Sequence, residues 1–365
     1  MSVLDELSQI GVSIWLDDLD RHRIESGNLA NLIASHCVVG VTTNPSIFEK
    51  ALTSGVAEYA PQLAQLKGSD VNTAVKALTI HDVQAACDIF HETWVNSNGV
   101  DGRVSLEVDP RLAHDTKATI AQARELWAAV DRKNLMIKIP ATLAGVPAIT
   151  QVIGSGISVN VTLIFSVERY RDVMNAWLEG LELAQSNGHD LATIESVASF
   201  FVSRVDAQVD KELDALGTQQ AQSLRGKAAI ANAQLAWAAF VDTTQQSRWT
   251  ALSEQGAHVQ RPLWASTGVK DPTYDDTRYV IELAAPGCVN TMPESTLNAV
   301  ADHGVSRGDT VTGSAISAQQ VWDELATIGI DRIAICEHLE KDGVAKFIDA
   351  WNQLLTSLSE TLAEI

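Results

Sequence analysis

Lys138 stands inside an apolar segment, Asn134-Leu-Met-Ile-Lys-Ile-Pro140, whose large aliphatic residues predict a buried strand. A charge inside such a strand is costly unless it is paired or used in chemistry. Burial disfavours the ammonium form of a lysine, and the neutral amine can attack a carbonyl group to form a Schiff base. The alternative is a lysine that reaches solvent or forms an ion pair. The segment makes Lys138 a candidate nucleophile.

Two other segments, 104–109 and 157–163, alternate polar and apolar residues with the period of a strand. The polar residues that share a face in one or the other segment are Ser105, Glu107, Asp109, Ser158, Asn160 and Thr162. Carboxylates can move protons, and neutral amide and hydroxyl groups can hold a polyhydroxylated chain. Together with a lysine amine, these groups are what imine chemistry on a sugar requires.

More polar residues stand where other strands are expected to end. Asp17 and Asp18 end the first of these strands, Asn44 follows the second, and the segment Ser199-Phe-Phe-Val-Ser-Arg204 ends the sixth with a hydroxyl and a guanidinium suited to phosphate. Each of these residues has a local structural alternative. Asp17 or Asp18 would cap the next helix, Asn44 would form a turn before Pro45, and Arg204 would pair with Asp206 or Asp210. For Thr162 of the segment 157–163, the alternative is a residue that only favours strand formation.

Short strand-like segments alternate with stretches of helical periodicity along the whole chain. The expected strands are Ser13–Asp18, Val38–Thr43, Arg103–Asp109, Leu135–Ile139, Ile157–Leu163, Ser196–Val202, Pro262–Thr267 and Cys288–Met292. The expected helical stretches include Asn72–Val95, Asp115–Val130, Val167–Ala184, Gln219–Val241, Tyr274–Ala284 and Val344–Leu362. Eight such repeats, without a dinucleotide-type glycine pattern after the first strand, predict a (β/α)8 barrel rather than an open sheet. Polar residues at the carboxyl ends of its strands would meet at one rim.

The domain organisation expected is a single barrel domain over residues 1–365. Helical insertions are expected near 45–102 and 204–261, and a helical extension that caps the barrel near 295–365. A separate second domain is the alternative.

Composition excludes several classes of protein. The 365 residues include 26 Lys and Arg against 46 Asp and Glu, a net charge of −20, which argues against a nucleic-acid partner. The acidic N-terminus and the absence of a long apolar run predict a cytoplasmic protein without a membrane partner. The four cysteines are expected to be reduced core residues, and the nine histidines show no metal-ligand spacing, so no metal is expected. Gly154-Ser-Gly156 lacks the rest of a nucleotide loop, so no cofactor is expected.

The ordered motifs resemble those of the transaldolase family over nearly the whole chain. They are Asp17 within LDDLD, Thr42-Thr-Asn-Pro-Ser46, Ser105-Leu-Glu-Val-Asp109, Ile137-Lys-Ile-Pro140, Asn160-Val-Thr162 and Ser199-Phe-Phe-Val-Ser-Arg204. The segment Leu263-Trp-Ala-Ser-Thr-Gly-Val-Lys-Asp-Pro272 resembles the longer bacterial and plant-type branch in its actinobacterial form. Where many family members have a phosphate-binding arginine in this segment, none stands here, and Ser266 and Lys270 are the candidates for that contact.

The resemblance implies a class I aldolase-type barrel that moves a dihydroxyacetone unit from sedoheptulose 7-phosphate to glyceraldehyde 3-phosphate, giving erythrose 4-phosphate and fructose 6-phosphate. Lys138 would form the Schiff base, Asp17 would take the proton of the C4 hydroxyl, and Glu107 with Thr162 would position a water. Substrate would be bound by Asn44, Asn160, Ser199, Phe201 and Arg204, with Ser266 or Lys270. The pathway implied is the non-oxidative branch of the pentose phosphate pathway, and the protein is expected to be a monomer or a homodimer.

Two alternatives remain at this point. Fructose-6-phosphate aldolase-type lyases of the same family carry Gln and Tyr at the positions that match Glu107 and Phe201, so Glu and Phe favour transfer over release of free dihydroxyacetone. A sugar-phosphate-binding protein without activity is the other hypothesis, and the presence of Lys138, Asp17 and Glu107 argues against it.

Overall fold

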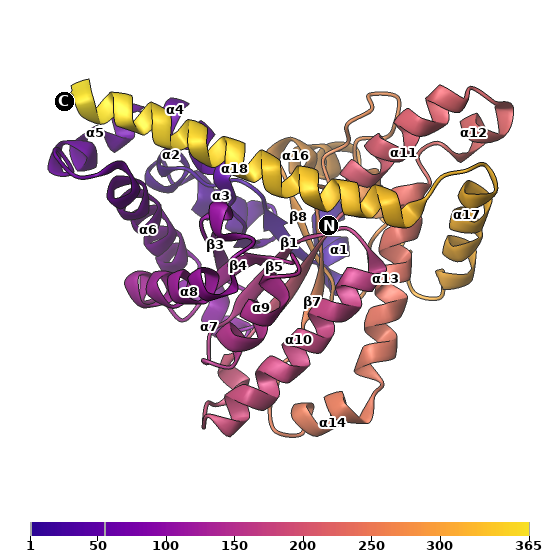
Figure 1. The fold of residues 1–365 in the computed structure, drawn as a ribbon, viewed down its shortest axis with the longest axis horizontal. Helices are drawn as coiled ribbons and strands as arrows, with labels where there is room; N and C mark the ends of the chain where they lie inside the picture. Colours follow the sequence, from indigo (N-terminus) through magenta and orange to yellow (C-terminus); the bar gives the residue numbers. More distant parts are fainter. Residues whose placement is uncertain (1, 55, 365) are drawn as a thin grey trace.

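The strands of this protein close into a parallel barrel in chain order (Figure 1). The computed structural model describes residues 2–54 and 56–364, and in this part of the chain there are eight strands, β8 pairing with β1. They are β1 Ser13–Leu16, β2 Val38–Val41, β3 Arg103–Glu107, β4 Leu135–Pro140, β5 Val159–Ile164, β6 Ser196–Phe201, β7 Arg261–Ala265 and β8 Val289–Met292. The predicted (β/α)8 barrel is confirmed, and each predicted strand overlaps an observed one.

Helices surround the barrel and fill the long connections between strands. They are α1 Val3–Ile10, α2 Arg21–Glu25, α3 Asn28–Ser35, α4 Pro45–Ser54, α5 Val56–Gln65, α6 Val71–Ile89, α7 His91–Asn96, η1 Pro110–Leu112, α8 Thr116–Val130, α9 Gly145–Ile153, α10 Val167–Ser186, η2 Leu191–Thr193, α11 Ser203–Leu216, α12 Gln219–Leu224, α13 Ala228–Thr244, α14 Ser247–Ser253, α15 Arg278–Ile281, α16 Glu294–His303, α17 Ala315–Thr327 and α18 Arg332–Glu364. Among the described helices, none combines the length and the apolar content needed to cross a membrane.

The register of neighbouring strands places the predicted chemical residues side by side. Lys138 on β4 lies opposite Glu107 on β3 and opposite Asn160 on β5. All residues of these three strands are buried, because helices cover the outside of the barrel and side chains fill its interior. The three polar groups therefore share one dry environment.

The opposite end of the barrel, where the strands begin, is closed by buried arginines. Arg261 at the start of β7 donates to the Ser13 hydroxyl at 2.8 Å and pairs with Asp101 at 3.1 Å. Arg103 at the start of β3 donates to the carbonyl of Gly99 at 2.6 Å. Both guanidinium groups thus bind partners within the protein, as expected for the face of a barrel that serves stability.

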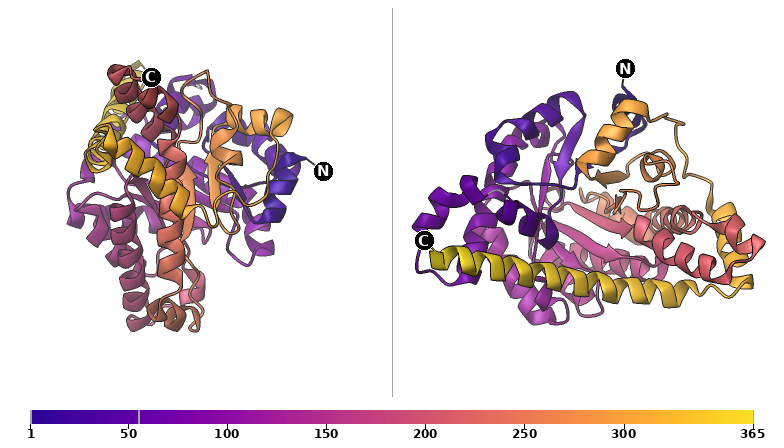
Figure 2. Two further views of the ribbon diagram at one scale, coloured as in Figure 1. Left: turned by 90° about the vertical axis from the view of Figure 1, so that its right-hand side faces the viewer. Right: turned by 90° about the horizontal axis from the view of Figure 1, so that it is seen from above.

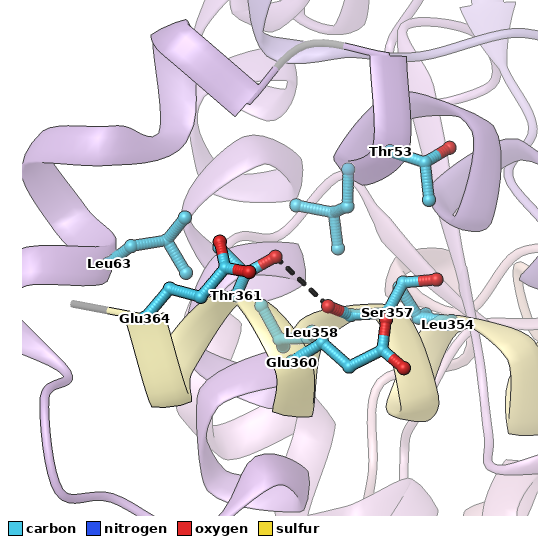
Figure 3. Close-up of a pocket in the computed structure, with 9 residues that line it drawn as sticks. Thr53, Leu63, Leu354, Ser357, Leu358, Glu360, Thr361 and Glu364 are labelled. Atoms are coloured by element: carbon cyan, nitrogen blue, oxygen red, sulfur yellow. Dashed lines mark hydrogen bonds between the residues drawn. The ribbon is translucent and has the colours of Figure 1, made fainter.

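The long helix α18 distinguishes this barrel from a minimal one. Its 33 residues would span about 50 Å at the usual helical rise, and Figures 1 and 2 show it running along the long dimension of the molecule. It contacts α4 and α6 toward its C-terminal end, and α11 and β5 toward its beginning. At the far end Leu354 and Leu358 are buried beside a pocket of about 250 Å³ that Leu63 of α5 also lines (Figure 3). None of the predicted site residues lines that pocket.

Three predicted helical stretches are wrong in part. Asn72–Val95 is interrupted at Phe90, between the end of α6 and the start of α7. Gln219–Val241 is not continuous: α12 ends before Gly226, which adopts a left-handed φ of 66° and donates its N–H to Asp210 at 2.9 Å. In Tyr274–Ala284 only α15 is an α-helix. There the Asp275 carboxylate accepts bonds from the backbone N–H and the hydroxyl of Thr277, a local turn that competes with helical hydrogen bonding.

Candidate active site

Lys138 is buried at the centre of the site, with a relative exposure of 3%. Its Nζ donates to the backbone carbonyl of Thr43, just after β2, at 2.9 Å and lies 3.2 Å from Oε2 of Glu107. The pairing with Glu107 follows from the β3–β4 register, and the Thr43 carbonyl comes from the end of β2, two strands away from β4 in the barrel. The alternative of an ion-paired lysine thus describes part of the arrangement, and the partner is another predicted site residue.

Glu107 is an unusual carboxyl group because it is buried beside the amine. Burial raises its pKa to about 7, although the charge and hydrogen bonding of Lys138 lower it and the charge of Asp17 raises it further. A group with a pKa near neutrality can both give and take a proton under physiological conditions. The pair therefore has the properties of an amine with an adjacent acid/base group.

Asp17 follows β1 and lines the cavity above Lys138. Burial raises its pKa, and the charge of Lys138 and the hydrogen bond from Thr42 act in the opposite direction. The Thr42 hydroxyl donates to Oδ1 of Asp17 at 2.7 Å and lies 2.7 Å from the hydroxyl of Thr291 on β8. These contacts fix the orientation of a carboxyl that can accept a proton from a bound hydroxyl.

The neighbouring acids have other partners. Asp18 pairs with Arg23 at 2.8 Å, and Asp20 caps α2 by accepting from the backbone N–H of Arg23 at 2.6 Å. The alternative that Asp17 or Asp18 caps the next helix is therefore wrong, because Asp20 is the cap and Asp17 faces the cavity.

Neutral polar groups form a connected row across three strands. The Ser199 hydroxyl donates to Oδ1 of Asn160 at 2.7 Å, and Nδ2 of Asn160 donates to the Ser105 hydroxyl at 3.0 Å. The Thr162 hydroxyl is fully buried and has no hydrogen-bond partner within the described residues. A buried hydroxyl in this condition is able to bind a water molecule or a substrate group.

The cavity has a volume of about 180 Å³ at the carboxyl ends of the strands. Eight of the eleven predicted site residues line it: Asp17, Asn44, Lys138, Ser199, Phe201, Arg204, Ser266 and Lys270. Glu107, Asn160 and Thr162 are not part of its lining, and Glu107 and Asn160 flank Lys138 on the neighbouring strands. Asn44 lines the cavity and also has a local structural contact, because its Oδ1 accepts from the backbone N–H of Ile47 at 3.1 Å at the start of α4.

Asp109 does not belong to the site, so the predicted polar face is wrong at this position. β3 ends at Glu107, and the chain turns into η1 with Asp109 as its cap. The Asp109 carboxylate pairs with Arg111 at 2.6 Å. Period-two alternation applies only as far as the strand continues.

Part of the cavity lining is cationic, and we call this part, around Arg204, the far end of the cavity. Arg204, in the first turn of α11, stacks its guanidinium over the Phe201 ring at 5.4 Å, and its Nη1 is buried without a hydrogen-bond partner among the described residues. Burial lowers the pKa of Arg204. The alternative partners Asp206 and Asp210 instead accept from Tyr279 and Tyr274, each at 2.7 Å.

The seventh-strand segment brings two further groups to this end. Ser266 adopts a left-handed φ of 56°, and its hydroxyl lies 2.9 Å from that of Ser203. Gly268 and Lys270 also line the cavity. A buried guanidinium with an unused N–H group, beside a hydroxyl and an ammonium, is suited to a phosphate ester.

Several residues that line the cavity were not predicted from the sequence. Thr291 and Pro293 come from the end of β8, and Phe347 comes from α18, with its ring 5.8 Å from Nζ of Lys138. Thr42 and Ser46 lie within a motif that was recognised, but only Asn44 was selected from it. No pattern around Phe347 distinguishes it from an ordinary core residue of an amphipathic helix.

The described part of the chain contains neither a cluster of metal ligands nor a disulfide. No group of three or more His, Cys, Asp or Glu side chains there could hold a metal ion. Cys37, Cys87, Cys288 and Cys336 are free thiols, as predicted, but Cys37 is only partly buried and is not a core residue.

Comparison with known proteins gives consistent matches. The family model described as transaldolase/fructose-6-phosphate aldolase matches residues 14–358. A transaldolase of Mycolicibacterium paratuberculosis is 59% identical over 362 residues, 98% of this chain and 97% of that protein. Transaldolases of Mycobacterium tuberculosis (strain H37Rv) and Saccharopolyspora erythraea are also 59% identical, over 96% and 99% of this chain and 95% and 98% of their own lengths.

Proposed function

The chain belongs to the transaldolase/fructose-6-phosphate aldolase family, and from this premise we propose that it is a transaldolase with Lys138 as its Schiff-base nucleophile. The enzyme moves a dihydroxyacetone unit from sedoheptulose 7-phosphate to glyceraldehyde 3-phosphate, giving erythrose 4-phosphate and fructose 6-phosphate. The observation that carries the proposal is the buried Lys138–Glu107 pair beneath a cavity that has Asp17 on its rim and Arg204 at its far end.

In the first half of the reaction, the Lys138 amine attacks the C2 carbonyl of the ketose phosphate and water is lost, which leaves a protonated imine. Asp17 takes the proton of the C4 hydroxyl while the bond between C3 and C4 breaks. The electron pair of that bond moves into the imine, which acts as an electron sink, and the phosphorylated aldehyde leaves. The three-carbon unit stays on Lys138 as the enamine.

The second half is the reverse with another aldehyde. The enamine carbon attacks the incoming carbonyl carbon, Asp17 returns its proton to the new hydroxyl, and water hydrolyses the imine to release the product ketose, fructose 6-phosphate. Glu107, whose pKa is raised to about 7, suits the proton transfers that accompany loss and addition of water. The unpartnered hydroxyl of Thr162 is a suitable ligand for that water.

Substrate binding is divided between the two ends of the cavity. Asn44 and Ser199 are in position to hold hydroxyl groups near the imine, and Ser199 is itself oriented by Asn160. Arg204, Ser266 and Lys270 would bind the phosphate. Phe201 lines the cavity and packs against the Arg204 guanidinium.

Transfer and release can be separated in one experiment. The protein is incubated with fructose 6-phosphate, with and without erythrose 4-phosphate, while sedoheptulose 7-phosphate and free dihydroxyacetone are both measured. Transaldolase activity predicts sedoheptulose 7-phosphate only when the acceptor is present, with little free dihydroxyacetone. Acceptor-independent release of dihydroxyacetone would instead identify an aldolase-type lyase, and the absence of both products would refute the enzyme assignment.

Sugar phosphates are the substrates that this function requires. We further propose that the protein acts in the cytoplasm, as a monomer or a homodimer, and binds no nucleic acid. The net charge of −20 supports the last point, because nucleic-acid binding depends largely on cationic surface.

A further inference from the structure

A second cavity opens beside the reaction cavity, between α11 and α18. Its volume is about 460 Å³, and it shares Arg204 and Lys270 with the reaction cavity. The side chains that line the second cavity but not the first include Lys211, His338, Asp342 and Lys346. We call this second cavity the outer groove.

The outer groove is strongly cationic in a protein that is acidic overall. Its lining holds Arg204, Lys211, Lys270 and Lys346, and the carboxylate within it is Asp342. Asp342 lies 2.6 Å from Nζ of Lys346, one helical turn away, and its charge also acts on Arg204. Within the lining, four cations face one carboxylate, although the whole chain carries −20. Lys211 and Lys270 also border an adjacent cavity, whose carboxylates have partners of their own in Tyr279, Tyr274 and Arg225: Asp206, Asp210, Asp214 and Asp271. Such local excess attracts anions irrespective of net charge.

Helix α18 reaches the groove because residue 343 has no side chain. A Cβ at Gly343 would lie 3.0 Å from Cδ2 of Leu163 and 3.5 Å from Nη1 of Arg204. Glycine within a helix costs about 1 kcal/mol relative to alanine. The close approach places Lys346 in the groove and the adjacent Phe347 in the reaction cavity, so that α18 forms a wall of both.

The two donors of the proposed reaction place their phosphates at different distances from Lys138. When C2 of either ketose is bound to the amine, the phosphate of sedoheptulose 7-phosphate lies one carbon farther out than that of fructose 6-phosphate. The same difference separates erythrose 4-phosphate from glyceraldehyde 3-phosphate as acceptors. A single rigid phosphate site would favour one chain length, whereas cations spread from one cavity into the next can serve both.

We propose that Lys211 and Lys346 form an outer phosphate subsite, used by the longer of the two phosphorylated aldehydes and by the seven-carbon ketose. Arg204 and Lys270, which border both cavities, contact the phosphate of either chain length. The inference rests on the proposed transaldolase function and adds a determinant of chain-length specificity, half of it supplied by the C-terminal helix.

The test keeps the donor constant and varies the acceptor. With fructose 6-phosphate as donor, kcat/KM is measured for erythrose 4-phosphate and, by isotope exchange, for labelled glyceraldehyde 3-phosphate. The variants are Lys211→Gln, Lys346→Gln and their combination. Lys341→Gln, an exposed lysine of α18 outside the groove lining, is the matched control, and Lys346→Arg keeps the charge.

Each single glutamine variant is expected to lower kcat/KM for erythrose 4-phosphate by about threefold to fivefold, the size of one exposed charge pair. The value for glyceraldehyde 3-phosphate should change by less than about twofold, and so should both values in Lys341→Gln and Lys346→Arg. Thermal melting of the variants, expected to match the wild type, separates a binding effect from a folding defect.

Two results would overturn the proposal: equal losses for both acceptors, which indicate general attraction of anions, and no loss for either. Failure of the proposed function is distinguishable from both, because the wild-type protein would then transfer to neither acceptor.

Discussion

The stability of the fold should depend on pH through Glu107. Burial raises the pKa of this carboxyl from its ordinary value of 4.5 to about 7. At about 1.4 kcal/mol for each pKa unit, the difference corresponds to about 3 kcal/mol. Below pH 4.5 the group is protonated in both the folded and the unfolded chain. Between 4.5 and 7 the unfolded chain releases the proton first, so the free energy of unfolding falls as the pH rises, and above 7 the full cost applies.

Substitution of Glu107 by Gln removes this titration while keeping the shape of the side chain. The free energy of unfolding of Glu107→Gln, relative to that of the wild type, should therefore be larger at pH 8 than at pH 5 by about 2–3 kcal/mol, which means a more stable variant at high pH. Comparing two pH values cancels any constant effect of the substitution on Lys138. The expected sign is a stability gain at high pH accompanied by a loss of activity, since the group is used in proton transfer.

Urea unfolding followed by tryptophan fluorescence at pH 5, 6, 7 and 8 measures this difference. Glu92→Gln, at an exposed position of α7, serves as the control and should follow the wild type at every pH. A constant difference between Glu107→Gln and the wild type across this range would refute the reasoning, because it would mean that burial does not hold the proton on Glu107.

The remaining predictions concern activity. Arg204→Ala should raise KM for phosphorylated ketoses by about 10- to 100-fold, which corresponds to the loss of one charge-assisted hydrogen bond, and should have little effect on unphosphorylated sugars. Equal effects on both substrate types would exclude a phosphate contact. Thr42→Val removes a hydrogen bond that lowers the pKa of Asp17. The acidic limb of the pH profile of kcat/KM should therefore move to higher pH. An unchanged limb would argue that Asp17 is not the group that titrates. Metal chelators should leave activity unchanged, because the imine serves as the electron sink; loss of activity that added metal restores would contradict the mechanism.

The barrel could be predicted from sequence because its strands are local features. Each is a short run of buried residues with a clear boundary, and the eightfold repetition excludes most other folds. Strand parity placed Glu107 on the polar face of its strand, and the barrel placed that face and Lys138 at one rim, but their direct pairing becomes visible only in the structure. Parity could not show where β3 stops, and the prediction therefore carried Asp109 into a site from which the chain has already turned away.

The residues that distant segments of the chain contribute to the cavities could not be predicted from the sequence. Phe347 and Lys346 enter their cavities because α18 crosses the barrel, and helical periodicity predicts only that one face of the helix is buried, not what lies beneath it. The prediction of one continuous helix over Gln219–Val241 was wrong at Gly226 for a related reason. Its left-handed conformation is stabilised by Asp210, sixteen residues earlier in the chain, a contact that no local pattern reveals.

Trapping of the covalent intermediate tests the central claim most directly. The protein is treated with borohydride in the presence of fructose 6-phosphate, digested and mapped by mass spectrometry, with Lys138→Ala as the control. The account predicts a reduced three-carbon adduct on Lys138 in the wild type, and neither adduct nor turnover in a Lys138→Ala protein that still folds. An adduct on another lysine, or full turnover without trapping, would contradict the assignment of Lys138 as the nucleophile.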